Sequence, residues 1–201
     1  KSGTQTGWQK FRDFLHLLFI DHGFLRALYD NRFRLAGGLY RINQPSPNRL
    51  SVYKCKYGIK TVINLRGRNE QLGWYRLEEQ ACKELGLHLV NTQVYSRGLV
   101  DSERLSELKG IIQDMELPAV VHCKSGADRA GFFSVLYRHY RLGEPIETSL
   151  SELGLFYGHS KSAKTGVLDF FFQAYIRDRG LRQAFSEWAK SRFNREALQS
   201  K

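Results

Sequence analysis

Short apolar runs alternate with amphipathic segments along most of the chain. Runs rich in apolar and β-branched residues predict strands at 37–42, 61–65, 88–94 and 119–122. Apolar residues that recur every three or four positions predict helices at 47–57, 74–85, 102–115, 131–141, 145–153, 167–177 and 181–194. Strands that alternate with helices are typical of an α/β fold. We therefore expect a mostly parallel central sheet of about four to five strands, flanked by helices.

The beginning of the chain has a different pattern. Residues 8–29 carry aromatic and leucine side chains at helical spacing, which predicts an amphipathic helix. Such a helix either packs on the domain or lies in a membrane interface. We divide the chain into an N-terminal amphipathic helical extension at 1–35, a central domain at 36–177 and a C-terminal helix packed on it at 178–201.

Composition and charge narrow the class of partner. The 201 residues are 42% hydrophobic and 25% charged, as in a soluble globular protein. Lys and Arg number 31 against 20 Asp and Glu, and this net charge of +11 favours phosphorylated proteins, acidic membranes or nucleic acid as partners. The three cysteines lack metal-like spacing, and reduced thiols suit the cytoplasm. The sequence shows no secretory pattern, so we expect a cytoplasmic protein, with association to a membrane as the alternative. Because it begins at Lys1 rather than Met, we also expect that a preceding segment is missing from it.

One stretch carries most of the chemistry, Val120 to Gly131, with the sequence VVHCKSGADRAG. A predicted strand ends at Cys123, a compact loop follows, and a helix begins after Arg129. A helix N-terminus offers backbone N–H groups and a partial positive charge, which attract phosphate and favour thiolate over thiol. The guanidinium of Arg129 can bind two phosphate oxygens. This loop therefore supplies a nucleophile, an anion cradle and a cation.

His122 and Cys123, followed by five residues and Arg129, resemble the signature of the cysteine-based protein tyrosine phosphatase superfamily. The chain's size resembles its compact dual-specificity branch, over residues 36–177, which the resemblance identifies as a catalytic domain. The resemblance implies that Cys123 attacks phosphorus, and that Arg129 and the loop N–H groups bind phosphate. The phosphate-binding positions are Lys124, Ser125, Gly126, Ala127 and Ala130. His122 either orients the loop or is an ordinary core histidine. The resemblance implies neither a metal nor a cofactor.

Two aspartates are candidates for the general acid that protonates the leaving oxygen. The family places this residue on a loop upstream of the cysteine, where Asp101 lies, although Asp101 is also a suitable helix N-cap. Asp128 directly precedes the loop arginine, as in myotubularin-like and Sac-type phosphoinositide phosphatases. It either acts as the acid or pairs with a nearby base and shapes the loop.

The remaining features bear on the substrate. Ala130 stands where the family usually has Ser or Thr, so we expect a slower or differently assisted second step. Basic residues could form a rim around the pocket and favour a substrate with several phosphates; they are Arg66, Arg68, Arg97, Lys161 and Lys164.

Several functions fit these residues. We expect a phosphatase acting on phosphotyrosine or dual-specificity protein substrates. The alternatives are the same chemistry on a phosphoinositide or another phosphorylated lipid or glycolipid, and a phosphate-binding pseudophosphatase. His122 and Arg129 argue against a rhodanese-like sulfurtransferase. A nucleic-acid partner is not expected.

Overall fold

The computed structural model of the chain describes Trp8 and residues 31–96, 98, 100–160, 164–178 and 184–192. The described residues form two compact units. The first comprises those up to Gln93 together with Glu116–Gly126, and the second comprises Val94–Met115 together with those from Ala127 onward. The chain passes from the first unit to the second between Gly126 and Ala127, within the loop that follows Cys123.

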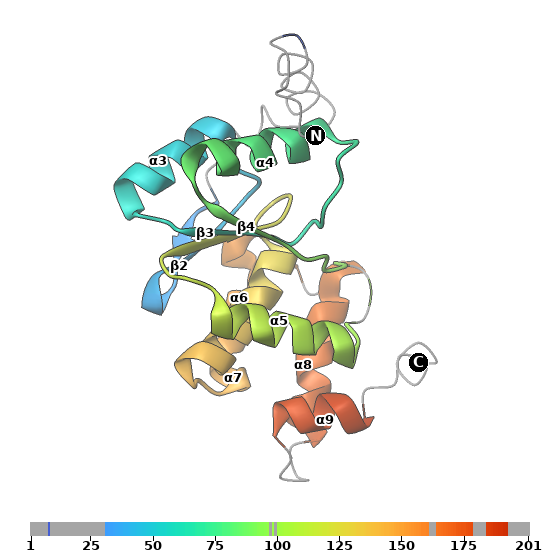
Figure 1. Ribbon diagram of the computed structural model, residues 1–201. Coiled ribbons are helices and arrows are strands. Elements are labelled where there is room, and N and C mark those ends of the chain that lie inside the picture. The colour runs from blue at the N-terminus through green and yellow to red at the C-terminus, as the bar shows by residue number, and fades with distance from the viewer. Residues whose placement is uncertain are drawn as a thin grey trace. The chain divides into compact units, whose positions relative to one another are not determined.

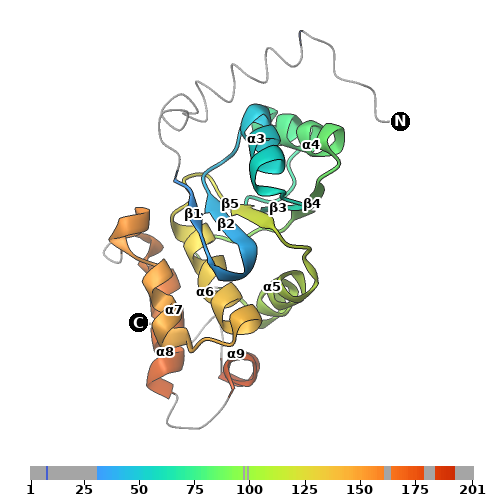
Figure 2. The same ribbon diagram turned by 90° about the vertical axis from the view of Figure 1, so that its left-hand side faces the viewer.

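The first unit is built on a five-stranded sheet with the order β1-β2-β5-β3-β4. Its strands are β1 (Phe33–Arg34), β2 (Leu39–Ile42), β3 (Thr61–Asn64), β4 (His88–Asn91) and β5 (Ala119–His122). Strands β2, β5, β3 and β4 are parallel, and only the short β1 is antiparallel to its neighbour (Figure 2). The mostly parallel α/β fold is thus confirmed. The sequence did not predict β1.

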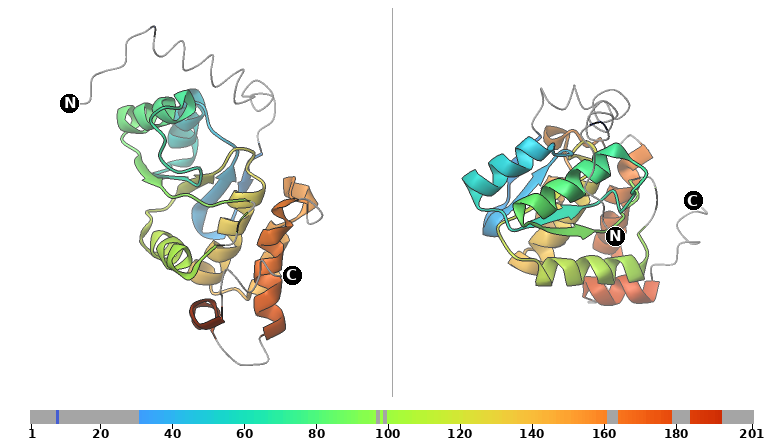
Figure 3. Two further views of the ribbon diagram at one scale, coloured as in Figure 1. Left: turned by 90° about the vertical axis from the view of Figure 1, so that its right-hand side faces the viewer. Right: turned by 45° about the horizontal axis from the view of Figure 1, so that its top comes forward.

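Two helices cover one face of this sheet, α3 (Pro47–Tyr57) and α4 (Gly73–Leu85) (Figures 1 and 3). Alternate strand residues form the core against them, among them Tyr40, Ile42, Val62 and Val120. Helix α3 begins as the sequence predicts, with Pro47 in its first turn and the Ser46 hydroxyl accepting the Arg49 N–H. This burial of branched side chains stabilises the strands that carry the loop after β5.

The second unit is helical. Its longer elements are α5 (Ser102–Asp114), α6 (Asp128–Leu142), α8 (Val167–Asp178) and α9 (Phe185–Arg192), and the short ones are α7 (Ile146–Ser149), η3 (Leu150–Glu152), η4 (Leu155–Tyr157) and η5 (Lys164–Gly166). The short η2 (Ala36–Gly38) belongs to the first unit. An aromatic cluster joins α6, α8 and α9 through ring contacts, and its members are Phe132, Phe171, Phe172, Phe185 and Trp188.

Some predicted boundaries were wrong. The strand expected at 88–94 ends at Asn91, because its partner β3 ends at Asn64 and only an isolated antiparallel bridge, Arg66 to Gln93, lies beyond. The helix expected from Gly131 begins at Asp128, because the Gly131 N–H already donates to the carbonyl of Ala127.

The predicted helix at 8–29 lies outside the described residues apart from Trp8, and the three-part domain division stays a prediction. Among the residues that the structure describes, none of the helices has the length and apolar character needed to cross a membrane.

Candidate active site

The loop after β5 lies at the carboxyl ends of the parallel strands. The carbonyl of His122 accepts the N–H of Leu65, which follows β3, at 3.0 Å. The carbonyl of Lys124 accepts the N–H of Gln44, which follows β2, at 3.3 Å. Ligands of open α/β sheets gather at this edge. The fold therefore places the Cys123 loop where anion binding is expected.

Three successive loop carbonyls are held by groups from elsewhere in the first unit. Besides the bond to Lys124, the Asn31 amide donates to the carbonyl of Ser125 at 2.9 Å, and the Arg41 guanidinium donates to that of Gly126 at 2.9 Å. The C=O and N–H of one trans peptide unit point in opposite directions. Each of these bonds thus turns the N–H of the same peptide away from the group that holds its carbonyl.

The sulfur of Cys123 lies on the side to which one of these N–H groups turns, that of Gly126. The Gly126 N–H donates to Cys123 Sγ at 3.3 Å, and the cysteine side chain is buried, with 1% exposed. An N–H that donates to sulfur stabilises a thiolate more than a thiol. The loop is therefore arranged for a nucleophilic cysteine.

A network of polar side chains in the first unit, among them the buried Glu78 and His122, adjoins this loop. His122 Nε2 lies 2.7 Å from Glu78 Oε1, and both side chains are completely buried. The Gln44 amide donates to the same Glu78 oxygen at 3.1 Å. The Arg66 guanidinium donates to Gln44 Oε1 at 2.8 Å and lies 3.6 Å from the ring centre of Trp74. The structure thus joins two predicted site residues, His122 and Arg66, to the backbone of the loop.

Glu78 and Arg41 were not predicted from the sequence as site residues. Glu78 lies four residues after Trp74 and four before Cys82, on the apolar face of α4. A carboxylate among apolar residues at helical spacing is the sequence feature that indicates a buried, paired charge. Arg41 lies within the apolar strand β2 and is completely buried. A charge at a core position needs a partner, so both residues could have been recognised as parts of a buried polar site.

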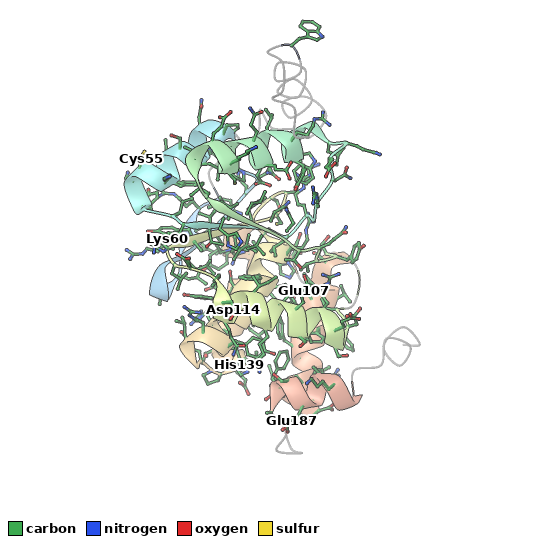
Figure 4. The ribbon with its side chains drawn as sticks, viewed as in Figure 1. Cys55, Lys60, Glu107, Asp114, His139 and Glu187 are labelled. Carbon is green, nitrogen blue, oxygen red and sulfur yellow. The ribbon has the colours of Figure 1, made fainter. Side chains whose placement is uncertain are left out.

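The other two cysteines have ordinary settings. Cys55 is exposed on α3 (Figure 4). Burial, followed by the neighbouring carboxylates of Glu78 and Glu79, raises the pKa of the Cys82 thiol far above its usual value. Neither lies in the loop after β5, so Cys123 remains the candidate nucleophile.

Arg68, on the surface of the first unit, pairs with Glu70 at 2.6 Å. The second unit contains the remaining predicted site residues that the structure describes. Asp101 is the N-cap of α5, where its Oδ1 accepts the Arg104 N–H at 2.8 Å. Arg129 follows Asp128 in the first turn of α6, and Ala130 is completely buried. Arg97 and Lys161 lie outside the described residues, as does the side chain of Lys164.

A cluster of two aspartates and one histidine lies at the start of α6. His159 Nδ1 is 2.7 Å from Asp128 Oδ1, and His159 Nε2 contacts Asp169 Oδ2 on α8. Burial disfavours the histidine's charge, but the hydrogen bonds to Asp128 and Asp169 outweigh it and raise the pKa of His159 to about 9. Burial also opposes ionisation of Asp128, but hydrogen bonds from His159 and Thr165 and the charge of Arg129 lower the pKa of its carboxyl.

These shifts predict a loss of stability at alkaline pH. The pKa of His159 is raised from its ordinary 6.5 to about 9, so its stabilising charge is fully present below 6.5 and is lost as the pH rises through 9. We expect the free energy of unfolding to fall by up to about 3 kcal/mol over this interval. Urea unfolding at several pH values measures this fall.

A second histidine provides the control for this measurement. His139 lies on the same unit and bonds to the backbone carbonyl of Glu144. His159→Gln should remove the alkaline fall and His139→Gln should keep it. The same fall in the His159→Gln protein would contradict the assignment.

Within the part of the chain that the structure describes, no group of three or more His, Cys, Asp or Glu side chains is arranged to hold a metal ion.

Known proteins resemble this chain in sequence and in fold. The family model described as a DSP-PTPase phosphatase fused to NAD+ kinase matches residues 39–165. The dual specificity protein phosphatase TpbA of Pseudomonas aeruginosa (strain UCBPP-PA14) is 24% identical over 124 residues, which are 61% of this chain. The match spans 53% of that relative, about half its length.

Solved structures show the same fold. The crystal structure of P. aeruginosa TpbA has a TM-score of 0.56 at 21% identity, and covers 85% of this chain and 91% of its own. The crystal structure of PTPMT1 has a TM-score of 0.53 at 16% identity, and covers 76% of this chain and 99% of its own. Because the family model matches more than half of a chain whose cysteine loop lies at the carboxyl edge of the sheet, this protein belongs to the PTP-NADK family of DSP-PTPase phosphatases, within the cysteine-based protein tyrosine phosphatase superfamily.

Proposed function

We propose that this chain hydrolyses phosphomonoesters through a phosphocysteine intermediate on Cys123, and that phosphotyrosine or dual-specificity protein substrates are its natural class. The hydrogen bond from the Gly126 N–H to Cys123 Sγ carries the proposal, because it puts the sulfur inside the turn of the loop. The first turn of α6, with Arg129, follows directly along the chain. A related crystal structure, that of a TpbA variant, contains phosphotyrosine, which supports this substrate class.

The chemistry proceeds in two steps. The thiolate of Cys123 attacks phosphorus, the bond from phosphorus to the leaving oxygen breaks, and a general acid supplies a proton to that oxygen. Water then attacks the phosphocysteine and gives a proton to the carboxylate that acted as the acid, and the S–P bond breaks to release phosphate and the thiolate. Arg129 and the N–H groups of Lys124, Ser125, Gly126, Ala127 and Ala130 stabilise the equatorial oxygens in both steps.

We assign the general acid to Asp101. The assignment rests on the family's placement of this residue upstream of the cysteine, on the loop where Asp101 begins α5. Arg66 and Arg97 are proposed as basic residues that recognise the rest of the substrate. The first of these is linked to the loop through Gln44.

Release of phosphate from an aryl phosphate tests the proposal. The wild-type chain should turn over, acid quenching should trap a phosphoenzyme, and Cys123→Ser should do neither. Asp101→Asn should lower the rate of hydrolysis of both phosphates, and the loss should be about tenfold or more larger for an alkyl than for an aryl phosphate. The poor alkyl leaving group depends far more on the proton. A wild-type chain that binds phosphate without turnover would instead be the pseudophosphatase that Ala130 suggests.

Phosphoinositides are the second candidate substrate. The crystal structure of PTPMT1 in complex with PI(5)P has a TM-score of 0.53 to this chain. Two large apolar side chains on η4 of the second unit, Leu155 and Phe156, are 80% and 76% exposed, as suits contact with a lipid surface. Together with the net charge of +11, they support association with an acidic membrane.

A panel of phosphopeptides, soluble phosphoinositides and phosphoinositide vesicles separates the two candidates. Higher kcat/KM on phosphotyrosine peptides than on every lipid supports the protein substrate. Higher kcat/KM on vesicles, reduced by Leu155→Ser and Phe156→Ser together, supports the lipid.

A further inference from the structure

The aspartate–histidine cluster has a charge state that its geometry determines. Both ring nitrogens of His159 lie against carboxylate oxygens, those of Asp128 and Asp169. A carboxylate can only accept, whereas a neutral imidazole has one donor. His159 must therefore carry both protons to satisfy both contacts, and the cluster then contains one imidazolium between two carboxylates.

This charge state determines what Asp128 can do. An ionised Asp128 that accepts from His159 does not carry the proton that a general acid must deliver. Its negative charge instead lies in the first turn of α6, beside Arg129. Without compensation this carboxylate would repel a phosphate dianion at the same helix N-terminus, and His159 supplies the compensating charge.

The surroundings hold the histidine in place. Its side chain is completely buried, and its own N–H donates to the carbonyl of Gly154 at 3.2 Å. The preceding residue, Gly158, has a positive φ of 81°, and a Cβ there would lie 3.7 Å from that of Ala127, the N-cap of α6. The turn that carries His159 thus packs against the beginning of the helix.

We propose that His159 is a positioning residue for phosphate binding. Its imidazolium neutralises the charge of Asp128 and fixes the first turn of α6. This inference rests on the proposed function, since the phosphate is that of the proposed substrate. It assigns Asp128 a role in charge balance and leaves proton donation to another residue. It also gives Asp169 a role, because that carboxylate holds the far nitrogen of the ring.

The test uses opposite effects of charge on phosphate affinity. His159→Gln leaves two carboxylates without their cation, so the KM for an aryl phosphate and the Ki for inorganic phosphate should both rise about tenfold or more. Asp128→Asn removes one negative charge and should leave both constants unchanged or lower. The double variant should return them to within about threefold of wild type, because repulsion and compensation are removed together.

Three controls separate positioning from folding and from acid catalysis. Tm is measured for every variant. His139 lies on α6, as Asp128 does (Figure 4), and His139→Gln should leave KM and Ki unchanged. Asp169→Asn should lower Tm and raise neither constant. For Asp128→Asn, kcat is measured on an alkyl and on an aryl phosphate. The ratio of these two kcat values should match that of the wild type.

Different outcomes overturn different claims. If His159→Gln and Asp128→Asn both raise Ki to the same extent, the cluster is structural and the inference fails. If Asp128→Asn slows only the alkyl phosphate, Asp128 is the acid and the inference fails as well. A wild-type chain that neither hydrolyses the aryl phosphate nor binds inorganic phosphate would overturn the proposed function itself, before any variant is compared.

Discussion

Replacing Gly126 by alanine is expected to remove almost all of the proposed phosphatase activity. Gly126 has a φ of 77°, and a Cβ on it would lie 2.8 Å from three backbone atoms, Asn43 N, Ile42 C and Ile42 O. Backbone atoms at the end of β2 cannot move as a flexible side chain can, so the loop itself must shift. That shift would move the N–H that donates to Cys123 Sγ, and a displacement of about 1 Å lowers kcat/KM on the order of 100-fold.

Another glycine provides the control for backbone conformation alone. Gly143, the C-cap of α6, has a φ of 72°, and a Cβ on it would meet no atom within 4 Å. Gly143→Ala should therefore cost about 1–2 kcal/mol of stability without changing kcat/KM, because only the left-handed conformation is penalised. Equal activity losses in the two variants, measured with an aryl phosphate, would show that close approach at Gly126 is unimportant.

The fold and the loop could be predicted because their signals are local. Buried parallel strands appear as continuous apolar runs, such as 61–65, and the helix before β3 is marked by Ser46 and Pro47. The cysteine, the glycine and the arginine of the loop lie within seven residues of sequence. Such features need no knowledge of distant contacts.

The supporting residues could not be predicted because their partners are distant in sequence. Arg41 bonds to a carbonyl 85 residues away, and Asp128 pairs with a histidine 31 residues away. A single sequence does not show which buried charge meets which acceptor. For Asp128 the sequence permits two roles, acid or partner of a base, and in the structure its carboxylate pairs with His159.

Glu78 is the buried charge whose removal should have the largest effect on stability. Its carboxylate lies 2.7 Å from His122 and accepts from Gln44, and both the glutamate and the histidine are completely buried. Removing one partner of such a pair leaves the other without compensation in a medium of low polarity. Glu78→Ala should therefore lower the free energy of unfolding by about 3–5 kcal/mol, measured by urea denaturation.

Two further variants of α4 identify the cause. Glu78→Gln keeps the shape and an acceptor for His122, so its loss of stability should be the smaller of the two Glu78 variants. Glu84→Ala removes an exposed carboxylate of the same helix and should change stability by less than about 0.5 kcal/mol. Because His122 directly precedes Cys123, Glu78→Ala should also lower kcat in protein that remains folded. Full activity and wild-type stability in Glu78→Ala would mean that the network adjoining the loop supports neither folding nor catalysis.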